Sequence, residues 1–270
     1  MNLKTKIRNI IVKYIEKKFI ILCKKKFFLY NNLTFKINLN SIFKNKQLDK
    51  EYLIDKPRLD FLKIPDFTGG INAGDQKAIY FLIKKIKPTR VLEIGTHIGA
   101  STANIALAMN GHINKKTKLT TCDILDVNDE GKKQWKTFNS QNSPKDNMEI
   151  LKIKFPVLFI KDSSINYLKN TKHTYDFIFL DGFHRSDYVY TEIALSLKIL
   201  NPNGVILLHD YYPEGKSLFE NKNPILGPFE GVKRAMKENN SINIDPFLKL
   251  PWETKCKSHN STLAMLYKIN

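Results

Sequence analysis

A carboxylate and two glycines, Glu93, Gly95 and Gly99, stand at spacings that could hold a cofactor. They lie in and just after a short apolar run over residues 91–94, which predicts a strand buried on both faces. Glycine lets the backbone approach a ligand closely because it has no Cβ. Residues 100–109 then predict a helix whose first-turn N–H groups are free to face a bound group. A strand, a glycine turn and a helix in this order typically hold a nucleotide-like cofactor.

The spacing of the glycines narrows the class of cofactor. A dinucleotide site needs G-x-G-x-x-G, but here His97 stands where the middle glycine would be. We expect the side chain of His97 to face solvent. A phosphate loop needs a lysine after Gly99, and the sequence has none there. The pattern E-x-G-x-x-x-G instead resembles motif I of the class I S-adenosylmethionine-dependent methyltransferases, in the variant common among small-molecule O-methyltransferases. An ordinary glycine turn between a strand and a helix is the alternative.

Polar residues also end the other predicted strands. Four further apolar runs predict strands of this kind: residues 118–123, 157–164, 175–182 and 204–210. Ligands of parallel α/β sheets bind beyond the carboxyl ends of the strands, so we expect these ends to meet at one site. The resemblance implies that Glu93 pairs with the ammonium of S-adenosylmethionine and that Asp123 accepts hydrogen bonds from its ribose hydroxyls. The full set of implied cofactor contacts is Glu93, Gly95, Thr96, Gly99, Ser101, Asp123, Asp162, Ser163 and Asp181.

Two segments, residues 181–188 and 207–213, extend the resemblance. They are similar to a metal-dependent O-methyltransferase subgroup that acts on sugars, macrolides and related hydroxylated molecules, of the macrocin and cephalosporin-hydroxylase-like type. In this subgroup the acid that ends the fourth strand and an adjacent pair that ends the fifth hold a divalent cation such as Mg²⁺. The matching residues here are Asp181, His209 and Asp210. The cation would lower the pKa of the substrate hydroxyl, and the resemblance implies catalytic roles for Asp181 and for His184, which would take the proton.

One residue departs from this pattern. The first member of the pair after the fifth strand is acidic in well-known relatives, whereas here it is His209. Imidazole is a softer ligand that suits Zn, Fe or Ni better than Mg. Each of these residues could instead have no role in catalysis or cation binding. His209 would then be a histidine at the edge of the core, Asp181 and Asp210 would be solvated acids at strand ends, and His184 would contact only backbone.

The alternation of predicted strands and helices indicates a parallel sheet with right-handed crossovers. Helices are predicted over residues 163–168, 187–200 and 227–239, and two final strands over 242–250 and 261–269. Together with the resemblance, this predicts an α/β fold. Its Rossmann-like, seven-stranded, mostly parallel sheet would have the order 3-2-1-4-5-7-6, the last strand antiparallel and helices on both faces.

Charge divides the chain unevenly. The net charge is +18, and the first fifty residues hold 13 Lys and Arg against 2 Asp and Glu. We therefore expect a basic N-terminal extension over residues 1–67 and a methyltransferase domain over 68–270. Residues 1–31 alternate apolar and lysine positions like a basic amphipathic helix, which could lie on an anionic membrane surface. Packing on the domain or on a partner subunit of a homo-oligomer is the alternative. Residues 31–67 show no period and predict a connecting region or lid.

Composition bears on location. The three cysteines, Cys23, Cys122 and Cys256, are widely spaced, match no metal motif and suggest a reducing compartment. The sequence has no apolar run near the roughly 20 residues that a membrane span needs. We expect a cytoplasmic protein, with peripheral attachment to a membrane as the alternative.

The leading interpretation is an S-adenosylmethionine-dependent O-methyltransferase that acts on a hydroxyl of a small molecule or glycan. The basic charge leaves two alternatives with the same fold, a nucleic-acid-directed methyltransferase and a non-catalytic membrane-surface protein. Nucleic acid is disfavoured because Asp181-Gly-Phe-His184 replaces the Asn-Pro-Pro-Tyr type of base-flipping motif. The basic run also lacks interleaved aromatic residues for stacking.

Overall fold

The structure is a computed structural model that describes residues 37–66, 70–220 and 223–269. Residues Asn38–Lys268 form one compact unit. This unit includes residues 38–66, which the division by charge assigns to the basic extension. The predicted amphipathic segment, residues 1–31, lies outside the described residues.

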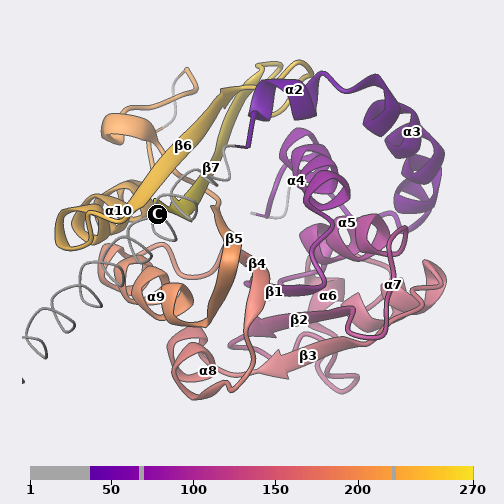
Figure 1. Ribbon diagram of the computed structural model, residues 1–270. Coiled ribbons are helices and arrows are strands. Elements are labelled where there is room, and N and C mark those ends of the chain that lie inside the picture. Colours follow the sequence, from indigo (N-terminus) through magenta and orange to yellow (C-terminus); the bar gives the residue numbers. More distant parts are fainter. Residues whose placement is uncertain (1–36, 67–69, 221–222, 270) are drawn as a thin grey trace, which may run out of the picture. The chain divides into compact units, whose positions relative to one another are not determined.

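A seven-stranded sheet runs through the unit in the order β3-β2-β1-β4-β5-β7-β6 (Figure 1). Strands β1 to β5 are parallel, and β7 is antiparallel to both β5 and β6. The predicted strand order and the antiparallel last strand are therefore confirmed. The strands are β1 (Arg90–Ile94), β2 (Lys118–Asp123), β3 (Val157–Lys161), β4 (Tyr175–Leu180), β5 (Leu200–Leu208), β6 (Ile242–Lys249) and β7 (Asn260–Lys268).

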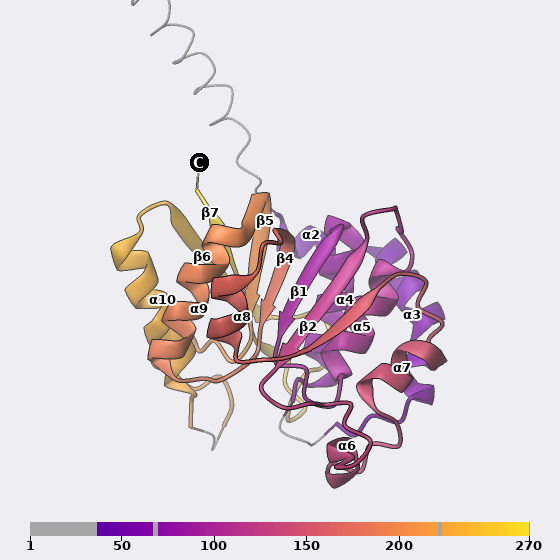
Figure 2. The same cartoon turned by 90° about the horizontal axis from the view of Figure 1, so that it is seen from below.

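Helices cover both faces of the sheet. Helices α8, α9 and α10 lie on one face, while α4 and α5 lie on the other with α3 and α7 outside them (Figures 1 and 2). The central strands β1 and β4 are almost wholly buried between these layers, which explains their continuous apolar runs. The helices are α2 (Leu39–Phe43), α3 (Lys46–Phe61), α4 (Ala73–Ile86), α5 (Ala100–Met109), α6 (Gln134–Thr137), α7 (Pro144–Ile150), α8 (Ser164–Asn170), α9 (Ser186–Ile199), α10 (Leu226–Glu238) and the 3₁₀ turn η1 (Pro213–Gly215).

The region expected to be an irregular connection, residues 31–67, instead holds α2 and α3 in its described part. Asn38 and Asn45 cap the two helices through their side-chain oxygens. Helix α3 buries only Leu48 and Tyr52 among its 16 residues. Apolar side chains therefore show no helical period along it, and the sequence pattern could not reveal the helix.

Strand β5 also begins earlier than the predicted start at residue 204. Leu200 already pairs with Tyr175, and a register shift in the pairing takes up the Asn201-Pro-Asn-Gly204 turn as a bulge. Asn203 adopts a φ of 63° there, which asparagine tolerates well. None of the described helices is both long and apolar enough to cross a membrane.

Candidate functional site

A cavity of about 550 Å³ opens beyond the carboxyl ends of the parallel strands. Residues that follow β1, β2, β3 and β4 line it together with Ile71, which precedes α4, and Tyr188 in α9. The structure thus brings most of the predicted site residues to one cavity. These are Gly95, Thr96, Ser101, Asp123, Asp162, Ser163, Asp181 and His184.

The two glycines of the turn are needed by the packing of the protein itself. Gly95 has a φ of 94°, and a Cβ on it would overlap the backbone carbonyl of Asp181. Gly99 has a φ of 81° and precedes α5, where a Cβ would come within 3.0 Å of the Pro144 side chain. Gly95 lines the cavity, whereas Gly99 lies behind its lining.

Glu93 lies in the layer behind the cavity. Its carboxylate is completely buried and accepts hydrogen bonds from Ser101 (2.5 Å), Thr102 (2.6 Å) and Thr121 (2.6 Å). Burial raises the pKa of Glu93 to about 7, although these three hydrogen bonds oppose the shift. Hydroxyl donors contact both of its oxygens, and Glu93 is not among the residues that line the cavity, so its expected direct contact with an ammonium group stays a prediction. Ser101 and Thr96 stand in the lining instead.

Asp123 ends β2 in a position to accept further hydrogen bonds. Its two oxygens accept from the backbone N–H groups of His97 (2.9 Å) and Leu125 (3.0 Å), which fixes the orientation of the carboxylate. His97 is half-buried and packs its ring 4.4 Å from that of Phe138, so it does not simply face solvent as expected. Burial lowers the pKa of His97, which leaves a neutral ring beside the cavity.

Asp162 and Ser163 follow β3 at the start of α8. The Ser163 hydroxyl accepts from the N–H of Asn166 at 3.2 Å and so caps the helix. The Asp162 carboxylate accepts from the Ser163 N–H at 2.8 Å and from the Asn166 amide. Both residues line the cavity, and Asp162 keeps acceptor capacity for a bound group.

Two aspartates and two histidines converge where the paired strands β4 and β5 end. Nε2 of His184 lies 3.5 Å from Asp181 and 3.2 Å from Asp210, and Nδ1 of His209 lies 3.0 Å from Asp181. One potential ligand atom of each side chain lies within 4.8 Å of the others. Asp210 adopts a φ of 51°, a conformation uncommon outside glycine that often marks functional positions.

The charges of this cluster are strongly coupled. Burial lowers the pKa of His184, but hydrogen bonds and charges from Asp181 and Asp210 outweigh it and raise that pKa to about 9. Burial likewise opposes protonation of His209, yet the same two carboxylates hold its pKa well above the usual range. The histidines in turn keep the pKa of both aspartates below its ordinary value against the effect of burial. With no cation bound, the cluster therefore favours charged imidazoles and carboxylates.

The donor set fits a divalent cation. Asp181 and Asp210 supply hard oxygen donors, and His209 supplies an imidazole nitrogen. Among the described residues, Nε2 of His184 and Nε2 of His209 have no hydrogen-bond partner of good geometry, although carboxylates lie near both. The arrangement can therefore hold a cation or move a proton.

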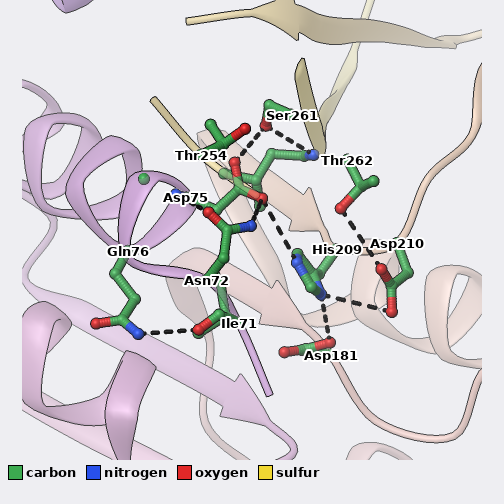
Figure 3. Close-up of polar contacts among 12 residues, drawn as sticks. Ile71, Asn72, Asp75, Gln76, Asp181, His209, Asp210, Thr254, Ser261 and Thr262 are labelled. Carbon is green, nitrogen blue, oxygen red and sulfur yellow. Dashed lines mark hydrogen bonds and ion pairs between the residues drawn. The ribbon is translucent and has the colours of Figure 1, made fainter. Parts of the chain in front are cut away.

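Sequence reasoning missed several residues around the site. Phe183 is 56% exposed beside the cavity and meets Tyr188 edge to face, with ring centroids 5.0 Å apart. Its position in the sequence between Asp181 and His184, both predicted site residues, could have indicated that it lies near the site. Asp75 of α4 carried no signal, because α4 was not predicted. Figure 3 shows His209 between Asp75 on one side and Asp181 and Asp210 on the other.

Part of the chain matches a known domain family. Residues 92–211 match a family model described as a methyltransferase domain, of the methyltransferase 24 type. No curated protein matches the chain. The match begins within β1 and ends shortly after β5.

Solved structures share the fold across most of the chain. An O-methyltransferase from Bacillus cereus in complex with S-adenosylhomocysteine has a TM-score of 0.53 at 16% identity, over 83% of this chain and 91% of that one. TomG, an O-methyltransferase from Streptomyces achromogenes involved in tomaymycin synthesis, was solved with S-adenosylmethionine. It has a TM-score of 0.54 at 16% identity, over 84% and 91%. A methyltransferase from Podospora anserina bound to S-adenosylhomocysteine has a TM-score of 0.53 at 16% identity, over 84% and 97%. Residues 92–211 thus match a methyltransferase domain, and the chain shares the fold of these solved methyltransferases.

Proposed function

We propose that the chain transfers the methyl group of S-adenosylmethionine to a hydroxyl oxygen of a small molecule or glycan. The observation that carries this proposal is the position of His184 between two carboxylates, in the lining of the same cavity as Asp123 and Asp162. A proton acceptor at the floor of a cofactor cavity is what removal of a hydroxyl proton requires.

The lining suggests how the donor is held. Asp123 would accept hydrogen bonds from the two ribose hydroxyls, since its orientation is already fixed by two backbone N–H groups. Asp162 and Ser163 would contact the adenine. Thr96 and Ser101, together with the bare backbone at Gly95, would receive the amino-acid end.

The chemistry at the acceptor needs a proton to leave. The acceptor oxygen forms a bond to the methyl carbon while the carbon–sulfur bond breaks and its electron pair stays on sulfur. The hydroxyl proton passes to the imidazole of His184, which Asp181 and Asp210 orient and stabilise once it is charged. The cavity would hold both reactants close and in line, which is a large part of catalysis in such transfers.

We also propose that Asp181, His209 and Asp210 hold a divalent cation. When bound, it would supply Lewis-acid chemistry that lowers the pKa of the acceptor hydroxyl. The support is the convergence of the four side chains, whose potential ligand atoms all lie within 4.8 Å of one another.

A transfer assay tests the function. The full chain would be incubated with methyl-labelled S-adenosylmethionine and a panel of sugars, glycosides and polyhydroxylated natural-product acceptors, with a divalent cation or a chelator. We expect labelled methyl ethers from at least one acceptor class and none from His184→Ala. Labelling of amines or of added RNA, with no acceptor hydroxyl labelled, would contradict the proposal.

We propose in addition that residues 1–31 attach the enzyme to anionic membrane surfaces. The support is the charge of the first fifty residues, 13 basic against 2 acidic. Sedimentation with vesicles rich in anionic lipid should retain the full chain in low salt and lose a chain that begins at residue 32. Equal retention of both chains would exclude this role.

A further inference from the structure

Asp75, in the first turn of α4, faces His209 from the side opposite Asp181 and Asp210 (Figure 3). Its side chain is completely buried, and its Oδ2 lies 3.7 Å from Nε2 of His209. Nδ1 of the same ring lies 3.0 Å from Asp181 and 3.7 Å from Asp210. In the described part of the chain, Nε2 has no hydrogen-bond partner, and Asp75 is the carboxylate within ion-pair distance of it.

Three parts of the fold hold Asp75 in place. Asn72 donates to Oδ2 at 2.7 Å, and Ser261 of β7 donates to Oδ1 at 2.6 Å. The start of α4 is itself pinned, because Trp252 donates to the carbonyl of Gly74 at 2.9 Å. A Cβ on Gly74 would also overlap the backbone of residues 253–254. The carboxylate of Asp75 could therefore turn away from His209 only by breaking its hydrogen bonds to Asn72 and Ser261.

We propose that Asp75 is a positioning residue that directs Nδ1 of His209 toward a cation shared with Asp181 and Asp210, and that the site therefore takes a transition-metal cation rather than Mg²⁺. This inference rests on the proposed cation site. A carboxylate behind the second nitrogen of a ligating histidine fixes its tautomer and ring orientation and raises its basicity. A fixed imidazole donor suits Zn²⁺, Co²⁺ or Ni²⁺ better than Mg²⁺, which prefers oxygen ligands.

An acid in the first turn of a helix also stabilises that helix, and Asp75 is well placed to do so. That role alone would make substitutions lower the melting temperature and leave cation affinity unchanged. The two roles therefore separate when both quantities are measured on the same variants.

The experiment is a titration of the metal-free full chain with Co²⁺ and with Mg²⁺, followed by visible absorption and calorimetry. The variants are Asp75→Asn, Ser261→Ala, which removes one partner of Asp75 without touching His209, and the matched control Asp176→Asn. Asp176 accepts from the N–H groups of Thr89 and Arg90 at the opposite ends of the strands. Melting temperature and S-adenosylmethionine affinity are recorded for each.

We expect the unsubstituted chain to bind one Co²⁺ at least tenfold more tightly than Mg²⁺. Asp75→Asn should weaken Co²⁺ binding by about 10- to 100-fold, Ser261→Ala by a few-fold, and Asp176→Asn not at all. Affinity for S-adenosylmethionine should stay within twofold in all three. If Asp75→Asn does not fold, the few-fold loss in Ser261→Ala carries the test alone.

The failing outcomes are distinct. Co²⁺ binding that is tight and unchanged in Asp75→Asn and Ser261→Ala would overturn the role of Asp75 and leave the proposed cation site intact. Tighter binding of Mg²⁺ than of Co²⁺ would overturn the metal class. An unsubstituted chain that binds neither cation would overturn the cation site and this inference together, without touching donor binding.

Discussion

Gly227, in the first turn of α10, packs directly against the backbone carbonyl of His184. A Cβ on Gly227 would overlap that carbonyl oxygen. The neighbouring Gly231 is packed in the same way against the carbonyl of Ser186. Helix α10 therefore fixes the segment that presents the proposed base. This relationship links a packing requirement on one helix to the position of His184 in the cavity lining.

Gly227→Ala should displace His184. We expect a loss of about 1–3 kcal/mol in the free energy of unfolding from overpacking, and a fall in kcat of tenfold or more because the base moves. Affinity for S-adenosylmethionine should change little. Gly131→Ala is the control, since a Cβ there would meet only the side chain of Asp129 at 3.2 Å. Full activity in Gly227→Ala would show that α10 does not position the base.

Transfer by the metal-free enzyme should depend on pH through His184. Its pKa is raised to about 9 by Asp181 and Asp210 against the effect of burial, so the ring is protonated at neutral pH and cannot accept a proton. The rate should rise about tenfold per pH unit up to roughly pH 9 and then level off. A bound cation would partly neutralise the carboxylates of Asp181 and Asp210. The pKa of His184 would then be lower, and the rate would level off at a lower pH. A flat profile between pH 6 and pH 9 would exclude His184 as the base.

Asp123 and Asp210 should separate donor binding from chemistry. Asp123→Ala removes two ribose acceptors and should weaken binding of S-adenosylmethionine by about 10-fold or more, at roughly 1.5–3 kcal/mol for hydrogen bonds to a charged group.

Asp210→Ala should abolish transfer and leave donor affinity nearly unchanged, because Asp210 faces the two histidines. A parallel loss of donor affinity in Asp210→Ala would mean that its role is misassigned.

Glu93 should make stability fall with rising pH. Its pKa is raised by burial to about 7, whereas in the unfolded chain it is ordinary, so between these values the folded state binds one more proton. The free energy of unfolding should therefore decrease by up to about 1.4 kcal/mol per pH unit from about pH 5 to pH 7. Denaturation of Glu93→Gln over the same range should lack this component. Identical pH slopes in both proteins would rule out a buried proton on Glu93.

Much of the fold could be predicted because its signals are local. Central parallel strands are buried on both faces, so β1 and β4 appear as apolar runs, and the site residues Gly95 and Asp181 directly follow them. Helices α5, α9 and α10 were predicted to within one residue. Helix α3 was not predicted because it buries only two of its 16 side chains, too few to give a periodic pattern, although Asn45 marks its start.

The site was predictable as a set of strand ends but not in its contacts. Nothing in the sequence shows that three hydroxyls from α5 and β2 donate hydrogen bonds to the carboxylate of Glu93, because these contacts depend on how the helix packs on the strands. Asp75 lies 134 positions before His209 in the chain and meets it only through the docking of α4 against β7. Tertiary packing of this kind leaves no short-range pattern to recognise.

The central claim is that the cavity at the carboxyl ends of the strands binds the methyl donor. Its most direct test is a crystal structure of the full chain with S-adenosylhomocysteine. The account predicts the ribose hydroxyls on Asp123, the adenine beside Asp162 and Ser163, and the sulfur facing His184. A donor bound elsewhere, or a cavity that stays closed to it while the protein binds it in solution, would contradict the account.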